Sequence, residues 1–140
     1  MLWVIDASVT AKWFIPELHK DKADQLLRDY MSDQIELIGP DLLIPEMGNL
    51  LSSRCKRGDI TPAEAAESYG LFLSLNIPMR PSSTLGLAAL GLAISERRSV
   101  YDMLYVALAE QSSCNFVTAD QKLVNALSKK FPCIQWIGDM

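Results

Sequence analysis

Short apolar runs alternate with longer segments of helical pattern, and this alternation limits the fold more than any other feature of the chain. The short runs are predicted to be strands: Leu2–Ile5, Ile35–Ile38, Ile77–Arg80, Phe116–Thr118 and Ile134–Ile137. The segments between them are predicted to be helices: Ser8–Phe14, Leu18–Met31, Ile44–Arg57, a helix from the N-cap residue Thr61 to about Leu75, Leu85–Arg97, Val100–Gln111 and Gln121–Lys130. Strands that alternate with helices predict an α/β fold in which helices cover both faces of a mostly parallel sheet.

Turn-forming residues set the expected ends of several elements. Gly39 and Pro40 are expected to close the second strand, and Pro78 makes the third strand a weak one. Gly58 is expected to end the helix before it, and Thr61 begins a capping-box pattern that starts the next helix.

The length of 140 residues corresponds to one compact domain, residues 1–140. Apolar residues make up 49% of the chain and charged residues 21%, which is typical of an ordered globular protein. No apolar segment is long enough to span a membrane, because the longest stretch without charge, Pro81–Ser95, contains serine and threonine. The first residues lack the basic start of a signal peptide, and Cys55, Cys114 and Cys133 form no CxxC pair. A reduced, cytoplasmic protein without a zinc site is therefore expected.

Two of the predicted strands end in an acid and a hydroxyl. Asp6 and Ser8 follow the first strand, and Thr118 and Asp120 follow the fourth. In an open parallel sheet, ligands bind outside the carboxyl ends of the strands. We therefore expect these four side chains to lie on one edge of the sheet.

Two further acids, Glu46 and Asp102, lie among apolar neighbours. A carboxylate is costly to bury unless a cation or a hydrogen-bond donor compensates it. Asn49 follows Glu46 by one helical turn, so both side chains are expected on the same face of their helix.

Each acid also has a structural explanation. Asp6 and Asp120 can cap the helices that follow them, Asp102 can complete a capping box with Ser99, and Glu46 can oppose a helix dipole. The four acids together favour a shared site, because converging carboxylates repel one another unless a divalent cation binds. Oxygen ligands suit Mg²⁺ or Mn²⁺, and such a site supports attack of water on a phosphodiester.

Four motifs in this order carry a resemblance to a known family. They are DAS at Asp6, PE-x-x-N at Glu46, YD-x-L-Y-x-A-L-A at Asp102 and TAD at Asp120. The ordered set resembles the PIN-domain nucleases, and within them the VapC-type toxins of toxin–antitoxin pairs. The resemblance extends from Leu2 to Ile137.

The resemblance implies a three-layer α/β/α sandwich that binds Mg²⁺ or Mn²⁺ and cleaves RNA. It implies an acidic catalytic quartet of Asp6, Glu46, Asp102 and Asp120, of which the three aspartates are direct metal ligands. Ser8, Asn49 and Thr118 match the supporting polar positions. Toxins of this type usually form homodimers and are silenced by a cognate antitoxin.

The charge balance bears on an RNA substrate, because phosphate contacts dominate nucleic-acid affinity. The chain has 13 basic and 17 acidic residues, a net charge of −4. If the four site acids hold metal, the remaining surface is neutral. The candidates for holding RNA are Lys12, Arg54, Lys56, Arg57, Arg97 and Arg98.

Two other functions stay open at this stage. A PIN scaffold that only binds a partner would keep the fold without cutting RNA. A receiver-like signalling domain is expected to have an acid at the end of its third strand, where this chain has Arg80 and Pro81. A mechanism based on His19, the only histidine, has no support because that residue lies in a polar run. The stretch Leu85–Ile94 is expected in the core or in a dimer contact.

Overall fold

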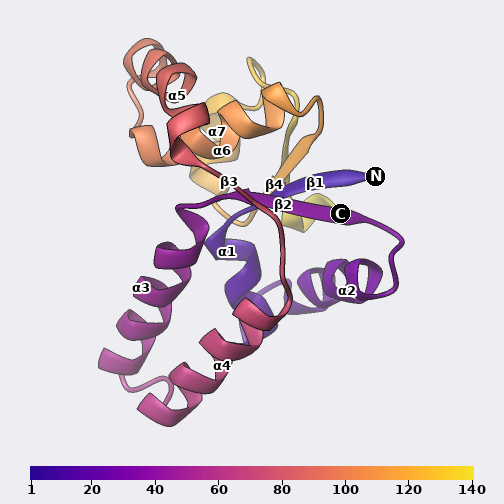
Figure 1. Ribbon diagram of the computed structural model, residues 1–140, viewed down its shortest axis with the longest axis vertical. Helices are drawn as coiled ribbons and strands as arrows, with labels where there is room; N and C mark the ends of the chain where they lie inside the picture. Colours follow the sequence, from indigo (N-terminus) through magenta and orange to yellow (C-terminus); the bar gives the residue numbers. More distant parts are fainter.

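Five parallel strands form one sheet in the computed structural model, which describes residues 1–140 (Figure 1). Their order across the sheet is β3-β2-β1-β4-β5. The strands are β1 (Leu2–Ile5), β2 (Glu36–Pro40), β3 (Met79–Arg80), β4 (Asn115–Thr118) and β5 (Ile134–Trp136). Every pair is parallel, as predicted, so all the carboxyl ends lie on one edge.

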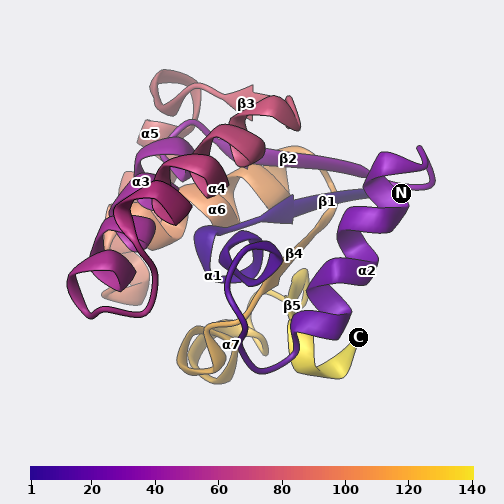
Figure 2. The ribbon, with the colours of Figure 1, turned by 90° about the horizontal axis from the view of Figure 1, so that it is seen from below.

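Helices cover both faces of the sheet, which confirms the predicted α/β/α sandwich (Figures 1 and 2). One layer contains α5 (Ser82–Glu96), α6 (Val100–Gln111) and α7 (Gln121–Leu127). The other contains α1 (Ala7–Thr10), the 3₁₀ helix η1 (Ala11–Trp13), α2 (Lys20–Met31), α3 (Leu43–Lys56) and α4 (Pro62–Ser74). A second 3₁₀ helix, η2 (Ile137–Asp139), ends the chain beside α2 (Figure 2). None of these helices has the length and hydropathy needed to cross a membrane.

Strand β1 divides the core because successive side chains point to opposite faces of a sheet. Val4 belongs to the cluster under α5, α6 and α7, whereas Ile5 belongs to the cluster under α1 to α4. Seven consecutive residues of α6, Met103–Ala109, are buried, which explains why that helix lacks a polar face over four of its residues.

The carboxyl end of β2 and the length of β3 differ from the prediction. Gly39 and Pro40 extend β2 instead of closing it, because they pair with Met79 and Arg80 of β3. Strand β3 is only those two residues long, so Pro78 limits it to a short edge strand.

The helix boundaries also differ in places. The segment predicted as Ser8–Phe14 divides into α1 and η1, and the helix predicted to end at Lys130 ends at Leu127. Helix α5 begins at Ser82, three residues before the prediction, because Pro81 in an extended conformation serves as its N-cap. The predicted capping box at Thr61 is present, and Gly58 has the left-handed conformation (φ 82°) expected after α3.

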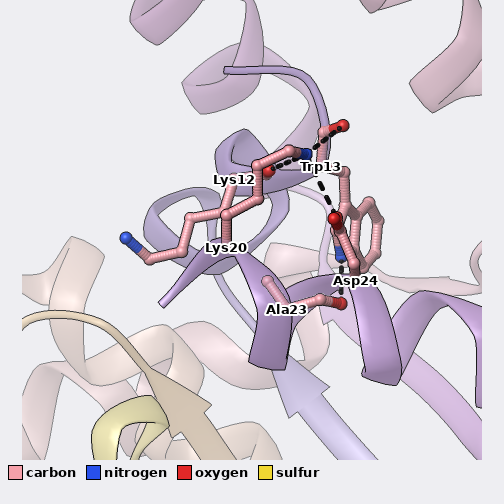
Figure 3. Close-up of polar contacts among 5 residues, drawn as sticks. All are labelled: Lys12, Trp13, Lys20, Ala23 and Asp24. Carbon is pink, nitrogen blue, oxygen red and sulfur yellow. Dashed lines mark hydrogen bonds and ion pairs between the residues drawn. The ribbon is translucent and has the colours of Figure 1, made fainter. Parts of the chain in front are cut away.

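Polar contacts with α2 fix the segment that follows β1 (Figure 3). The Trp13 indole donates to the carbonyl of Ala23 at 2.8 Å. The Lys20 ammonium donates to the carbonyls of Lys12 and Trp13 at 2.7 and 3.2 Å and to Asp24 at 3.1 Å. The Lys12 ammonium points away from this cluster (Figure 3). These bonds tie η1 to α2.

Gly39 sets how closely α3 approaches the sheet, because a Cβ there would lie 2.8 Å from Leu43 Cδ2 in the closed core. We expect Gly39→Ala to lower the free energy of unfolding by about 1–3 kcal/mol through overpacking. The matched change Gly91→Ala, in α5 where nothing lies within 4 Å, is expected to raise it by up to about 1 kcal/mol. Urea unfolding of both variants measures this, and equal effects of the two substitutions would contradict the packing argument.

Candidate functional site: an acidic cavity at the carboxyl edge of the sheet

Four acids line one cavity of about 240 Å³ at the carboxyl edge of the sheet. Asp6 follows β1, Asp120 follows β4, Glu46 comes from α3 and Asp102 from α6. Ser8, Tyr105 and four apolar residues complete the lining: Ala7, Leu50, Phe116 and Leu123. Positions more than a hundred residues apart in the chain thus meet because β1 and β4 are neighbours in the sheet.

Both oxygens of the Asp6 carboxylate accept hydrogen bonds. Oδ1 accepts from the Ser8 hydroxyl at 2.6 Å and from the Val9 amide at 3.1 Å, and Oδ2 accepts from the Thr118 hydroxyl at 2.6 Å. These donors stabilise the charged form of Asp6, yet burial has the larger effect and raises the pKa of Asp6 to about 6. The nearby charge of Glu46 raises it as well.

Hydroxyl groups join the ends of β1 and β4. The Ser8 hydroxyl accepts from the Ala119 amide at 2.9 Å, and the Thr118 hydroxyl accepts from the Asp120 amide at 3.1 Å. Thr118 is fully buried, so its hydroxyl depends on these partners. Together these bonds hold Asp6 and Asp120 at fixed positions on adjacent strand ends.

Glu46 receives a hydrogen bond that the sequence did not indicate. The buried hydroxyl of Tyr105 on α6 donates to Glu46 Oε1 on α3. Burial raises the pKa of Glu46, and the charge of Asp102 adds to this, while the bond from Tyr105 acts in the opposite direction. Tyr105 follows Asp102 by one turn of α6, which was the one signal in the sequence for its place in the site.

Asp102 lies at the start of α6, where its amide donates to the Ser99 hydroxyl at 3.0 Å. Burial raises the pKa of Asp102, the Arg98 guanidinium lowers it, and the charge of Asp120 raises it. Arg98 Nη2 lies 3.7 Å from Asp102 Oδ2. Asp102 is therefore the one acid of the four with a cationic side chain beside it.

Asp6, Asp120 and Glu46 have the structural roles predicted for them, whereas the capping box predicted for Asp102 with Ser99 is only half formed. Asp6 caps α1 and Asp120 caps α7, in each case by accepting an amide hydrogen bond, and Ser99 caps α6. Glu46 lies in the first turn of α3, where the helix dipole favours a negative charge. The caps orient the same carboxylates that line the cavity.

Asn49 is placed differently from the other predicted polar residues. It is exposed and lines a second hollow of about 490 Å³ together with Ser53 and Arg54 of α3. This groove shares three of its lining residues with the acidic cavity: Ala7, Glu46 and Leu50. Asn49 thus lies beside the acidic cavity, in the groove that continues from it along α3.

Most of the six basic residues considered for RNA binding form ion pairs with acids or are buried. Arg54 pairs with Glu17 at 2.8 Å and with Asp59 at 3.6 Å. Arg57 also pairs with Asp59, at 3.5 Å. Lys12 is buried, with 6% of its surface exposed. Arg54 is the one among the six that lines the groove beside the acids.

The oxygen atoms that line the cavity are of the kind that a hard divalent cation binds, because Mg²⁺ and Mn²⁺ prefer oxygen ligands such as carboxylates. The carboxylates lie farther apart than the ligands of a bound ion would. No three acid, histidine or cysteine side chains lie close enough together to hold one ion. Binding therefore requires the carboxylates to turn toward one another. Asp41 is an acid on the same edge that is excluded from the cavity, because Ser82 binds its carboxylate.

The family model of the PIN domain matches residues 3–127, and the chain therefore belongs to the PIN-domain family. A curated relative is the ribonuclease VapC3 of Pyrobaculum aerophilum, which is 30% identical over 138 residues. The match covers 96% of this chain and 98% of that protein. The family suggested by the four motifs is thus confirmed.

A solved structure shares the fold. The crystal structure of PAE2754 from Pyrobaculum aerophilum superposes with a TM-score of 0.71. The match covers 99% of this chain and 85% of that one at 21% identity. At this identity the likeness supports the architecture alone.

The raised pKa of Asp6 makes stability depend on pH. The folded protein holds this proton up to about pH 6, whereas the unfolded chain loses it near the ordinary value of 3.8. Stability from Asp6 is therefore complete below about pH 4 and is lost as the pH rises through about 6. We expect Asp6→Asn, measured by urea unfolding in EDTA, to match wild type near pH 4 and to exceed it by about 1–3 kcal/mol at pH 7.

The exposed acid Glu67 on α4 provides the control. Glu67→Gln removes one carboxylate without touching the cavity, so it measures the effect of losing a surface charge alone. A pH-independent difference for Asp6→Asn would show that burial does not favour the neutral form of Asp6.

Proposed function

We propose that this protein is an endoribonuclease that requires Mg²⁺ or Mn²⁺ and hydrolyses phosphodiester bonds in RNA. The main support is the group of four acids that line one cavity at the carboxyl edge of a PIN fold. Three of them, Asp6, Glu46 and Asp102, have raised pKa values because burial opposes their charge. A cation would relieve that electrostatic cost.

Asp6, Asp102 and Asp120 are the proposed metal ligands, and Glu46 is a fourth ligand or orients water at the ion. Ser8, Val9 and Thr118 hold the Asp6 carboxylate, so about one of its four lone-pair sites, on Oδ2, remains for a cation. When bound, Mg²⁺ or Mn²⁺ supplies Lewis acidity at the phosphoryl oxygen and at the attacking water. Glu46, with a pKa above its usual range, is suited to accept a proton from that water.

The proposed substrate strand passes along α3. The groove that adjoins the acidic cavity presents Asn49 and Ser53 to solvent, and these side chains can contact phosphate or sugar oxygens, whereas Arg54 in the same groove would first have to leave Glu17 and Asp59. An RNA substrate is favoured over other phosphodiesters because the curated relative is named a ribonuclease.

We extend the proposal to a biological role as the toxin of a toxin–antitoxin pair, acting in the cytoplasm as a homodimer and bound by an antitoxin. The relative named VapC3 supports the toxin role. Helix α5 supports a protein contact, because Leu87, Leu90 and Ile94 are exposed large apolar side chains on that helix.

Cleavage of a labelled single-stranded RNA in MnCl₂ or MgCl₂ tests the nuclease. EDTA is expected to abolish cleavage, and Asp6→Asn or Asp102→Asn is expected to lower the rate by roughly 100-fold or more while the protein stays folded. Each substitution removes a proposed ligand charge from the cavity and leaves side-chain size nearly unchanged.

Asp41→Asn serves as the matched control, because Asp41 lies beyond β2 on the same edge but is bound to Ser82. It is expected to cleave RNA like wild type. Full activity of Asp6→Asn would reject the assigned roles. Absence of any Mn²⁺ heat in calorimetry at neutral pH would favour the alternative, a PIN scaffold that binds a partner without cutting RNA.

A further inference from the structure

The hydroxyl of Tyr105 is the one tyrosine hydroxyl in this protein that donates a hydrogen bond to a carboxylate. Tyr30 and Tyr69 donate to the backbone carbonyls of Leu75 and Ile44, at 2.9 and 3.0 Å. Tyr101 is 64% exposed. A backbone carbonyl is a sufficient hydrogen-bond acceptor for a buried tyrosine hydroxyl. The need for an acceptor therefore does not by itself explain why the Tyr105 hydroxyl donates to Glu46.

The bond between Tyr105 and Glu46 joins the two helical layers. Tyr105 lies on α6 in the layer of α5, α6 and α7, whereas Glu46 lies on α3 in the opposite layer. Their meeting point is the acidic cavity, which both side chains line. No other hydrogen bond in the cavity ties α3 to α6.

The ring of Tyr105 is itself immobilised. It is 4% exposed and stacks on Phe116 of β4, with ring centroids 5.5 Å apart and planes 17° apart. Strand β4 also carries Thr118, which holds Asp6. The position of the Tyr105 hydroxyl is thus fixed by the same strand that positions Asp6.

We propose that Tyr105 is a positioning residue for Glu46: it holds Oε1 at the cavity wall, so that Oε2 stays available to a divalent cation. This inference rests on the proposed function, because it assigns Tyr105 a role in binding the divalent ion. Hydrogen-bond donors behind metal ligands orient them, and removing one typically costs about 10- to 100-fold in metal affinity or activity.

The test uses Mn²⁺ binding to the full chain, followed by the loss of the free-ion signal in electron paramagnetic resonance. Tyr105→Phe keeps the stacked ring and removes only the hydroxyl. It is expected to weaken Mn²⁺ binding about 10-fold or more. The control Tyr30→Phe removes a hydroxyl from a contact between α2 and the end of α4, and is expected to bind like wild type.

A double-variant comparison separates positioning from a general structural role. Glu46→Gln is expected to weaken Mn²⁺ binding by itself, and adding Tyr105→Phe to it is expected to weaken binding no further, because Tyr105 acts through Glu46. If Tyr105→Phe proves too unstable, Glu46→Asp provides a second test. It keeps the charge but breaks the bond from Tyr105 and shortens the reach to the cation, so it is expected to weaken Mn²⁺ binding, and wild-type affinity would overturn the proposal.

The outcomes distinguish the two proposals. If wild type binds Mn²⁺ and cleaves RNA while Tyr105→Phe binds Mn²⁺ equally well, the positioning role is wrong and the nuclease assignment stands. If Tyr105→Phe weakens binding equally with and without Glu46, Tyr105 acts by another route and the proposal is again wrong. If wild type binds no Mn²⁺, the proposed function fails, and the role of Tyr105 fails with it.

Discussion

The adjacency of two parallel strands, β1 and β4, is the constraint on which the rest of this structure depends. It brings the segment after Ile5 beside the segment after Val117, although more than a hundred residues separate them in the chain. The hydroxyl of Thr118 then reaches the carboxylate of Asp6, and the hydroxyl of Ser8 reaches the amide of Ala119. If β1 and β4 were not neighbours, Asp6 would have no bond from Thr118 and Ser8 would have no bond from Ala119. The acidic cavity between the two strand ends would not exist.

Burial governs the electrostatics of this cavity. Asp6 has three donors and still has a raised pKa, because the removal of water outweighs three favourable hydrogen bonds. Glu46 and Asp102 follow the same pattern, each with one principal partner and a neighbouring acid. A protein that keeps negative charge in such surroundings is less stable than it could be, and this is the usual compromise at a functional site.

The strand ends of the site were predictable from sequence, and the helix contributions were predictable only in part. Asp6 and Thr118 follow apolar runs, and parallel topology alone brings such positions to one edge. Asn49 lies on the same face of α3 as Glu46, since both line the groove, but only Glu46 also reaches the acidic cavity. The bond from Tyr105 depends on how two helices on opposite faces of the sheet approach each other, which no local pattern encodes. The start of α5 at Ser82 was missed for a similar reason, since the Ser82 amide donates to the carboxylate of Asp41, which is distant in the sequence.

Helices α3 and α4 project beyond the sheet as a pair, in which α4 packs mainly on α3 and α3 also packs on α1 and η1 (Figure 1). Near the sheet, Gly39 lets α3 pack closely, and Tyr69 ties α4 to the first turn of α3. Glu46 and Leu50 of α3 therefore form one wall of the acidic cavity, whereas the opposite walls belong to the sheet and to α6. Glu46 comes from this pair and the three aspartates come from the ends of β1 and β4 and from α6, so the separation between Glu46 and the aspartates is set by how α3 packs on the rest of the domain.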